Sequence, residues 1–218
     1  MSLSVRYSND KLIEAGIDEA GRGCLWGPLY AAAVIWPPEE DWLEEHKWLA
    51  PQIKDSKKIT PKKRAMLAEA IHAYAIDVGI GTVSAQEIDE MGMTRANKLA
   101  FERALFNLTV PPDRLLIDGI LKIDSPCQDV VTIVDGDASY LPIAAASIVA
   151  KEAHDEYVES CIEEEPALET YYNIQSCKGY GTEKHRKGIL EHGKHSQHRD
   201  LFLRKLLGNT SDCLITDT

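Results

Sequence analysis

The spacing of apolar and polar positions along the chain predicts an α/β protein. Five short apolar runs have the length of buried strands, and they cover residues 12–18, 28–36, 76–83, 114–118 and 130–134. A helix is predicted from Pro61 to about Tyr74, because Thr60 is a favourable N-cap and proline fits the first helical turn. A second helix is predicted to begin with Thr94 as its N-cap and to end before Pro111.

The second half of the chain is predicted to be mainly helical. A long helix is expected from Pro142 to about residue 161, followed by an irregular stretch over 166–182 and then by shorter basic helices. The resulting order, β-β-α-β-α-β-β-α and then helices, indicates a mixed central sheet flanked by helices. We expect residues 1–165 to form the main domain. Residues 166–218 are expected to form a helical extension packed on it, with a disordered tail.

The composition fits a soluble globular protein. The chain has 218 residues, of which 44% are hydrophobic and 27% charged. Its five cysteines include no C-x-x-C pair, which suits a reducing compartment. No apolar run approaches the ~20 residues of a membrane span, and no signal peptide is recognisable at the start. We therefore expect a cytoplasmic protein without membrane contact.

The net charge of -11 argues against a nucleic-acid partner if it is taken alone. The charge is unevenly distributed, however, because residues 52–64 carry six Lys or Arg against one Asp. Residues 176–205 are also rich in basic side chains, whereas 39–45 and 159–169 are acidic. The basic segments could form a local footprint for a polyanion, or they could simply be solvated faces.

Carboxylates follow the predicted strands at the points where ligands usually bind. Asp18 and Glu19 end the first strand, Asp118 ends the fourth, and Asp137 lies between the last strand and the long helix. Ligands of open α/β sheets bind beyond the carboxyl ends of parallel strands. Grouped carboxylates repel one another and need a cation, and oxygen ligands favour hard ions such as Mg²⁺ or Mn²⁺.

The segment after the first strand, "DEAGRG", raises a question of geometry. Neighbouring residues of a regular strand face opposite sides, so Asp18 and Glu19 share one site only if the chain leaves strand geometry there. Gly21 and Gly23 permit such a turn, and Arg22 would then face an anion such as phosphate. The alternative is a strand-to-loop turn with solvated acids and a surface arginine.

Five motifs in order resemble the ribonuclease HII family, the type 2 ribonucleases H. They are "GIDEAGRGCLWGP", "DSKKIT", "IDG", "GDASYLPIAAASIVAK" and "KGYGTEKH", and the resemblance extends over residues 12–207. It implies a ribonuclease H-like fold, a monomer, and dependence on Mg²⁺ or Mn²⁺. The implied activity is hydrolysis of the RNA strand of RNA–DNA hybrids. It also includes nicking 5′ of ribonucleotides embedded in duplex DNA, which leaves 3′-hydroxyl and 5′-phosphate ends.

The resemblance also implies the roles of the acids. Asp18, Glu19, Asp118 and Asp137 match the family's catalytic, metal-binding quartet. Two divalent ions held there would activate a water and stabilise the leaving oxygen. Asp155 competes for the fourth position, but it lies deep in the long helix, four residues after a lysine, where such pairs are common. We expect a structural role for Asp155.

The substrate contacts are assigned by the same resemblance. Backbone groups of Gly21, Arg22 and Gly23 would read the 2′-hydroxyl, which both donates and accepts hydrogen bonds. Tyr180 would stack on the deoxyribose at an RNA-to-DNA junction, with Thr182 beside it. Lys57 is a candidate phosphate contact, although Lys58 remains an alternative. Ser147 could reach the substrate backbone or cap a turn of its own helix.

Two positions depart from the family pattern. His154 stands where arginine is commoner, and Trp26 stands where smaller residues are usual, so that it could form a wall of the site. Histidines at 192, 195 and 198 invite a zinc-site interpretation, but their spacing drifts round a helix. A solvated basic surface is the preferred interpretation of these histidines.

Two other classes of function are considered. A non-catalytic nucleic-acid binding module would not need four acids near phosphate, which weaken binding unless metals are present. A metal-dependent exonuclease or recombinase would not need the two motifs that sense a 2′-hydroxyl, "GRG" and "KGYGT".

Overall fold

A mixed five-stranded sheet forms the centre of the computed structural model, which describes residues 3–208 apart from the side chains of Lys57 and Lys205. Its strands are β1 (Glu14–Ala20), β2 (Leu29–Ile35), β3 (Asp77–Val83), β4 (Arg114–Asp118) and β5 (Asp129–Ile133). They lie in the order β3-β2-β1-β4-β5, with β1 in the centre. β1 is antiparallel to β2, and β1, β4 and β5 are parallel to one another.

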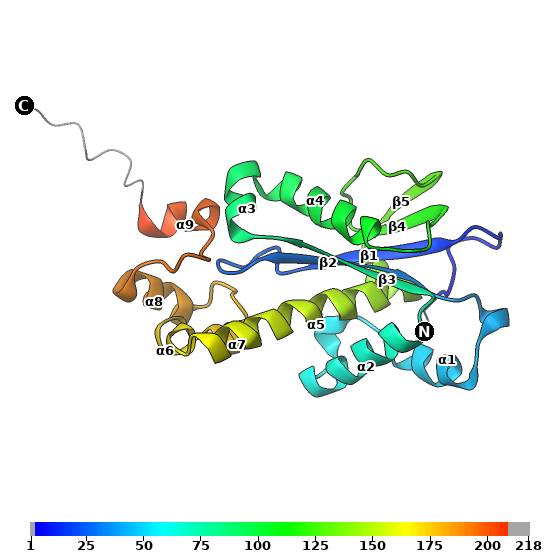
Figure 1. The fold of residues 1–218 in the computed structure, drawn as a ribbon, viewed down its shortest axis with the longest axis horizontal. Coiled ribbons are helices and arrows are strands. Elements are labelled where there is room, and N and C mark those ends of the chain that lie inside the picture. Colours follow the sequence, from blue (N-terminus) through cyan, green and yellow to red (C-terminus); the bar gives the residue numbers. More distant parts are fainter. Residues whose placement is uncertain (1–2, 209–218) are drawn as a thin grey trace, which may run out of the picture.

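Helices cover both faces of the sheet. Figure 1 shows α3 (Ala85–Met91) and α4 (Met93–Phe106) on one face, with α1 (Glu44–Leu49), α2 (Pro61–Tyr74) and α5 (Leu141–Glu164) on the other. The side chains of β1 alternate between the two faces of the sheet. Ala15 and Ile17 belong to the hydrophobic core between the sheet and α4, and Ala20 belongs to the core between the sheet and α5.

α5 lies very close to β1, and small residues explain why it can. A side chain on Gly16 would place its Cβ 2.2 Å from the carbonyl carbon of Pro142, so glycine is required there. The first turns of α5 carry the buried run Ala144, Ala145 and Ala146. This close approach brings the N-terminal half of α5 against the strand that carries Asp18 and Glu19.

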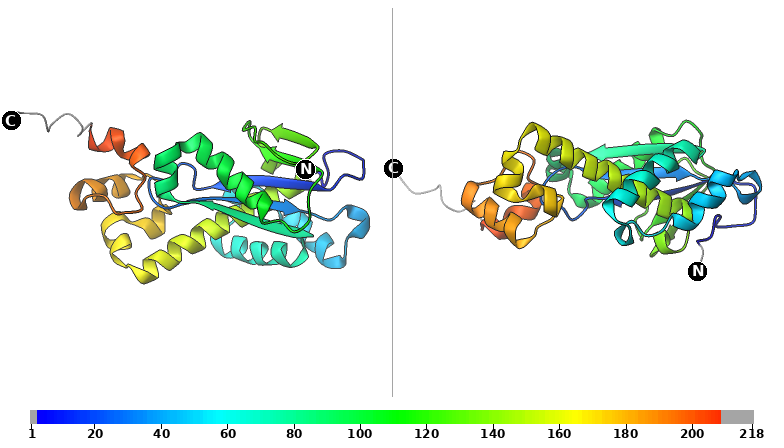
Figure 2. Two further views of the ribbon diagram at one scale, coloured as in Figure 1. Left: turned by 45° about the horizontal axis from the view of Figure 1, so that its top comes forward. Right: turned by 90° about the horizontal axis from the view of Figure 1, so that it is seen from below.

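Four further helices gather at one end of the molecule. They are α6 (Ala167–Tyr172), α7 (Ile174–Cys177), α8 (Glu183–His192) and α9 (Asp200–Leu207), and both views of Figure 2 show them beyond the sheet. Their core includes Leu168, Ile189 and Leu203, packed with Val158 of α5 and Trp26 of the loop after β1. Trp26 is completely buried, so it belongs to this core, and the expectation that it forms a wall of the site is wrong.

The structure confirms the predicted fold class and corrects several local assignments. Residues 167–172 and 174–177 are helical within the stretch expected to be irregular. α4 begins at Met93 after Gly92, whose φ is 80°, and Thr94 is therefore not its cap. Across the described part of the chain, no helix is long and apolar enough to span a bilayer. The expected disordered tail over 209–218 lies outside the described residues, and the division into two domains stays a prediction.

Candidate active site

Two of the predicted acids stand at the carboxyl ends of adjacent parallel strands. Ile17 of β1 is in register with Ile117 of β4, so Asp18 and Asp118 follow at corresponding positions on neighbouring strands. The field of Asp118 raises the pKa of Asp18, which shows that the two carboxyl groups interact. The sheet topology therefore brings together acids that lie 100 residues apart in the sequence.

Asp18 and Glu19 do not lie in a break of the strand. β1 stays paired with β2 through Asp18–Ala32, Glu19–Ala31 and Ala20–Tyr30, so neighbouring side chains alternate between the faces of the sheet. The expected departure from strand geometry at Asp18 and Glu19 is therefore absent, and the chain turns only at Gly21, whose φ is 83°. The charge of Glu19 nevertheless raises the Asp18 pKa, so the two carboxylates interact although the strand is unbroken, and a shared metal site for them stays a prediction.

Asp18 is buried in a way that resists its ionisation. Its side chain is almost enclosed, and this burial, together with the charges of Glu19 and Asp118, raises its pKa to about 8. Two hydrogen bonds act in the opposite direction, one from the Ser147 hydroxyl and one from the Glu19 N–H to Oδ1 at 2.7 Å. Ser147 Oγ also lies 3.0 Å from the Ser56 hydroxyl, which links the "DSKKIT" segment to the acid.

The short segment before α5 connects Asp118 with Asp137. The Gly136 N–H donates to Asp118 Oδ1 at 2.7 Å, and a Cβ on Gly136 would lie 3.2 Å from that oxygen and 2.7 Å from Ile143 Cδ1. Asp137 follows in a short 3-10 helix, Gly136–Ala138, and is buried. Glycine at 136 thus lets the chain pass close to the Asp118 carboxylate and places the fourth acid directly beyond it.

These acids have the chemistry of a site for hard divalent cations. They offer only carboxylate oxygens, and a buried carboxyl group with a pKa of about 8 exchanges its proton readily for a cation at neutral pH. Within the described residues, no three His, Cys, Asp or Glu side chains are already arranged to hold a metal ion. Because the donors are all carboxylate oxygens, their chemistry fits Mg²⁺ or Mn²⁺. The assignment of the four acids as ligands remains a prediction.

Asp155 belongs to a separate, fully occupied network. Its carboxylate receives Arg64 Nη2 at 2.6 Å and Lys151 Nζ at 2.7 Å, and His154 Nδ1 lies 3.1 Å away. The side chain is buried, and removing one partner from such a cluster typically costs roughly 3–5 kcal/mol. These contacts support the structural role predicted for Asp155.

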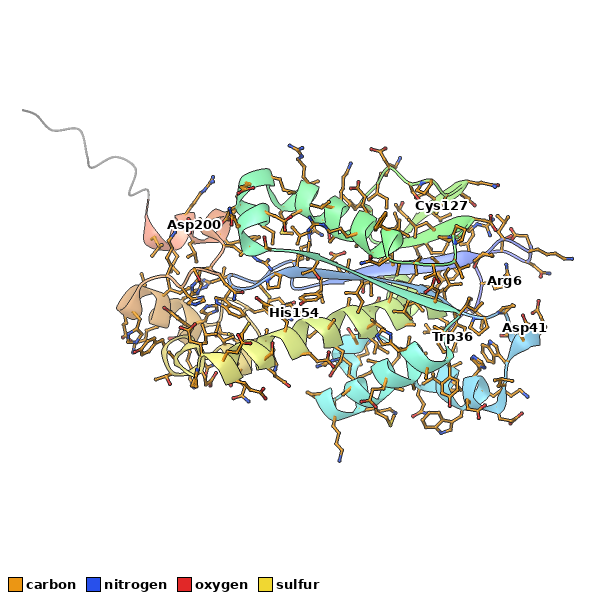
Figure 3. All side chains as sticks on the ribbon, in the orientation of Figure 1. Arg6, Trp36, Asp41, Cys127, His154 and Asp200 are labelled. Atoms are coloured by element: carbon orange, nitrogen blue, oxygen red, sulfur yellow. The ribbon has the colours of Figure 1, made fainter. Side chains whose placement is uncertain are left out.

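The loop from Gly21 to Gly27, which we call the GRG loop, contacts α5 at His154, the side chain that is labelled in Figure 3. His154 of α5 lies beneath it, because a Cβ on Gly21 would come 2.6 Å from the His154 ring. Arg22 is exposed at the surface and its Nη1 lies 3.6 Å from Glu19 Oε1. The Arg22 guanidinium is thus available to an anion beside the acids.

Tyr180 lies beside the GRG loop. It forms an antiparallel bridge with Cys24, and its ring lies over Gly23, in van der Waals contact at 3.7 Å from the place that a Cβ of Gly23 would take. Burial and the neighbouring Cys24 raise the Tyr180 pKa to about 12, and a hydrogen bond from the Gly21 backbone lowers it slightly. The ring remains 40% exposed, so a ligand could contact it.

The other predicted contacts have different positions. Thr182 is the N-cap of α8, and its hydroxyl accepts the His185 N–H at 3.4 Å. Ser147 is buried and is occupied with Asp18, as described above. The side chain of Lys57 lies outside the described residues, while Lys58 pairs with Asp55 at 3.3 Å.

A cavity of about 640 Å³ opens beside Asp137. Apolar residues form one side of it, and Lys54, Lys58 and Asp55 of the basic segment 52–64 form part of the rest. Asp137 is the member of the predicted quartet that lines this space. The basic segment therefore borders Asp137.

Arg199 is a residue that the sequence analysis counted only as surface charge. It is completely buried and donates to the backbone oxygens of the GRG loop, with Nη1 2.8 Å from Gly21 O. A single sequence gives little sign of this, because arginine is almost always exposed unless it is paired.

Comparisons with known proteins show the family of the chain. The family model described as Ribonuclease HII matches residues 15–205. The chain belongs to the ribonuclease HII family. The ribonuclease HII of Bacteroides thetaiotaomicron is 46% identical over 203 residues, which are 93% of this chain and 94% of that protein. The ribonuclease HII of Synechococcus sp. (strain CC9902) is 41% identical over 89% of this chain and 94% of the relative.

Solved structures show the same fold. Ribonuclease H2 from Pyrococcus horikoshii OT3 superimposes with a TM-score of 0.69 at 26% identity, covering 88% of this chain and 96% of that chain. The Archaeoglobus fulgidus structure of a PCNA:RNase HII complex gives a TM-score of 0.68 at 26% identity, covering 92% and 99%. The resemblance inferred from the five motifs is thereby confirmed. Membership in the ribonuclease HII family supports a nuclease that cleaves RNA–DNA hybrids.

Proposed function

We propose that this chain is a metal-dependent endonuclease that also nicks duplex DNA 5′ of embedded ribonucleotides. The observation that carries the proposal is the environment of Asp18. A buried carboxyl group, with its pKa raised to about 8 by burial, Glu19 and Asp118, lies next to the GRG loop. Such a group has little structural value, because its charge opposes folding, whereas a ligand role for divalent cations explains it.

The four acids are proposed to hold the cations. Asp18, Glu19, Asp118 and Asp137 would supply carboxylate oxygens to two Mg²⁺ or Mn²⁺ ions. When bound, such ions lower the pKa of a water and stabilise the negative charge on the leaving 3′-oxygen. The Gly136 N–H keeps Asp118 Oδ1 in a fixed direction, and Ser147 does the same for Asp18. The products would be a 3′-hydroxyl and a 5′-phosphate.

The GRG loop and Tyr180 are proposed to supply substrate selection. Backbone groups of Gly21–Gly23 can approach a 2′-hydroxyl closely, because a glycine presents no side chain. Arg22 is exposed and would contact a phosphate, while the open ring of Tyr180 would lie under the next deoxyribose. The two elements are in direct contact, so the reading of the ribose and of the junction would occur side by side.

Cleavage of a defined substrate tests the proposal. A DNA duplex carrying one ribonucleotide is incubated with the protein in Mg²⁺ or in EDTA, and the ends are mapped. We expect one nick 5′ of the ribonucleotide in Mg²⁺ and none in EDTA. Asp118→Asn should abolish the nick without unfolding the protein, because an asparagine oxygen can still accept the Gly136 N–H.

The loss at Asp118 should be large. Removal of one group that stabilises charge in the transition state typically costs roughly 3–4 kcal/mol, or a factor of 10²–10³ in rate. Near wild-type activity of the folded variant in Mg²⁺ would refute the metal-site assignment.

A further inference from the structure

Two adjacent residues before α9, His198 and Arg199, are buried where a solvated basic surface was expected. The Arg199 side chain is completely buried and His198 is 3% exposed, so the surface interpretation is wrong for His198, and Arg199 adds no exposed charge to the basic segment 176–205. The backbone of this segment is fastened to the GRG loop as well, since the Arg199 N–H donates to Leu25 O at 2.8 Å. Buried polar groups of this kind require specific partners.

Arg199 directs its donors to the backbone of the GRG loop. Nε donates to Gly27 O at 2.8 Å, and Nη1 donates to Gly21 O at 2.8 Å and to Arg22 O at 3.2 Å. No ion pair joins Arg199 to a carboxylate among residues 3–208, and its Nη2 atom has no hydrogen-bond partner there. The planar guanidinium thus acts as a fork for carbonyl oxygens, a geometry that lysine cannot reproduce.

These contacts determine where the amide groups of the loop point. In a trans peptide the N–H lies opposite the carbonyl of the preceding residue. When the carbonyls of Gly21 and Arg22 turn inward to Arg199, the N–H groups of Arg22 and Gly23 turn the other way. Arg22 and Gly23 are both exposed, so these two amides face the side from which a substrate would approach.

His198 reaches the other substrate-contact segment through a chain of hydrogen bonds. The His195 N–H donates to His198 Nδ1 at 2.7 Å, and His198 Nε2 lies 2.9 Å from His185 Nε2. His185 Nδ1 is in turn 2.9 Å from the Tyr180 carbonyl oxygen. A single assignment of protons satisfies the chain, with neutral His198 donating through Nε2 and neutral His185 donating through Nδ1.

We propose that His198 and Arg199 form a positioning unit for both substrate-contact segments. Arg199 orients the amides of the GRG loop towards the 2′-hydroxyl, and His198 fixes the Tyr180 backbone through His185. Neither residue touches the substrate. The inference rests on the proposed function, because it assigns the GRG loop to the ribose and Tyr180 to the junction.

Two substrates separate the two contributions. One is a uniform RNA–DNA hybrid, which presents 2′-hydroxyls without a deoxyribose junction, and the other is a DNA duplex with a single ribonucleotide. For Arg199→Lys we expect kcat to fall about 10- to 100-fold on both, with KM changing less than about threefold, since sub-ångström misplacement is costly in rate. For His198→Phe, which retains an aromatic ring, we expect about a tenfold loss on the single ribonucleotide and less than about twofold on the hybrid.

Arg204→Lys is the matched control, since Arg204 is an exposed arginine of the neighbouring helix. All rates are measured well below the melting temperature of each variant. Millimolar guanidinium added to Arg199→Ala should recover part of kcat on both substrates, and ammonium should not. Parallel losses on both substrates in every variant, following the melting temperatures and unaffected by guanidinium, would overturn the proposal.

Hydrogen exchange keeps this inference distinct from the proposed function. Amide exchange of the peptide 20–28 should be faster in Arg199→Lys than in the wild type or in Arg204→Lys, regardless of activity. If the wild type cuts neither substrate, the proposed function fails, and unchanged exchange in Arg199→Lys would separately overturn the role of Arg199 in holding the loop.

Discussion

Asp18→Asn should abolish cleavage and, in the absence of divalent cations, make the protein more stable. The Asp18 pKa is raised from 3.8 to about 8 by burial, Glu19 and Asp118, so its ionisation opposes folding. Because the folded-state pKa of Asp18 is raised, its ionisation lowers the free energy of unfolding. This loss of stability begins as the pH rises above 3.8 and grows until about pH 8. Asparagine carries no charge, and its oxygen can still accept the Glu19 N–H.

The size of this loss at pH 7 follows from the interval between the ordinary pKa of Asp18 and pH 7. Between the ordinary value of 3.8 and pH 7 lie about three pH units, and each corresponds to roughly 1.36 kcal/mol, which gives an upper limit of about 4 kcal/mol at pH 7. Rearranged hydrogen bonds around the new amide would reduce this gain. A net gain of about 2 kcal/mol would raise the melting temperature of a chain of this length by roughly 4–8 °C.

Thermal melts in EDTA at pH 5, 7 and 8 measure the effect. The difference between Asp18→Asn and wild type should increase from pH 5 to pH 8, whereas the exposed Asp41→Asn should show no such increase. Added Mg²⁺ should raise the melting temperature of the wild type and leave that of Asp18→Asn unchanged, because a ligand stabilises only the protein that binds it. A variant that melts below the wild type at every pH, or that still nicks the ribonucleotide duplex, would refute the reasoning.

Three further predictions concern the fourth acid, the exposed tyrosine and the buried histidines. Asp137→Asn should lose activity at nearly unchanged stability, whereas Asp155→Asn should lose roughly 3–5 kcal/mol of stability and keep more of its activity when folded; a larger loss of activity at Asp155 would reverse the assignment of the fourth acid. Tyr180→Ala should cut a single-ribonucleotide duplex about tenfold more slowly, since stacking is worth roughly 1–3 kcal/mol for a base and less for a sugar. Tyr180→Phe should be milder, and a wild-type rate for the Ala variant would contradict the stacking role. Burial lowers the pKa values of His185 and His198, the latter to about 3, so the stability they contribute should be complete above pH 6.5 and decrease as the pH falls below it; melting curves of wild type and His198→Phe with the same acid dependence would count against this.

The strand positions of the acids could be predicted because local patterns determine them. Short apolar runs that end on Asp18 and Asp118 indicate buried strands, and parallel neighbours place such ends together. The face on which each acid lies could not be predicted in the same way. It depends on whether β1 stays paired with β2, and the pairing continues to Ala20.

Of two features that the sequence analysis missed, one had a recognisable sequence pattern and the other had none. α3 was missed although Ser84 and Glu87 form a capping box, a pattern readable in sequence. The burial of Arg199 had no such signal. Its partners are backbone carbonyl groups of a loop some 170 residues earlier in the chain. Every residue type has a backbone carbonyl, so no side chain in the sequence marks these partners. Only the tertiary structure distinguishes Arg199 from the exposed Arg204.

The central strand β1 is synthesised early, whereas β4 and Arg199, which contact β1 and the loop after it, are synthesised much later. Asp18 meets Asp118 only after β4 has been translated, and the GRG loop meets Arg199 near the end of the described chain. At the usual 5–20 residues per second, the interval between residues 18 and 199 takes about 10 to 40 s. The proposed site can therefore be complete only when α9 and the segment before it have folded back onto the loop that follows β1.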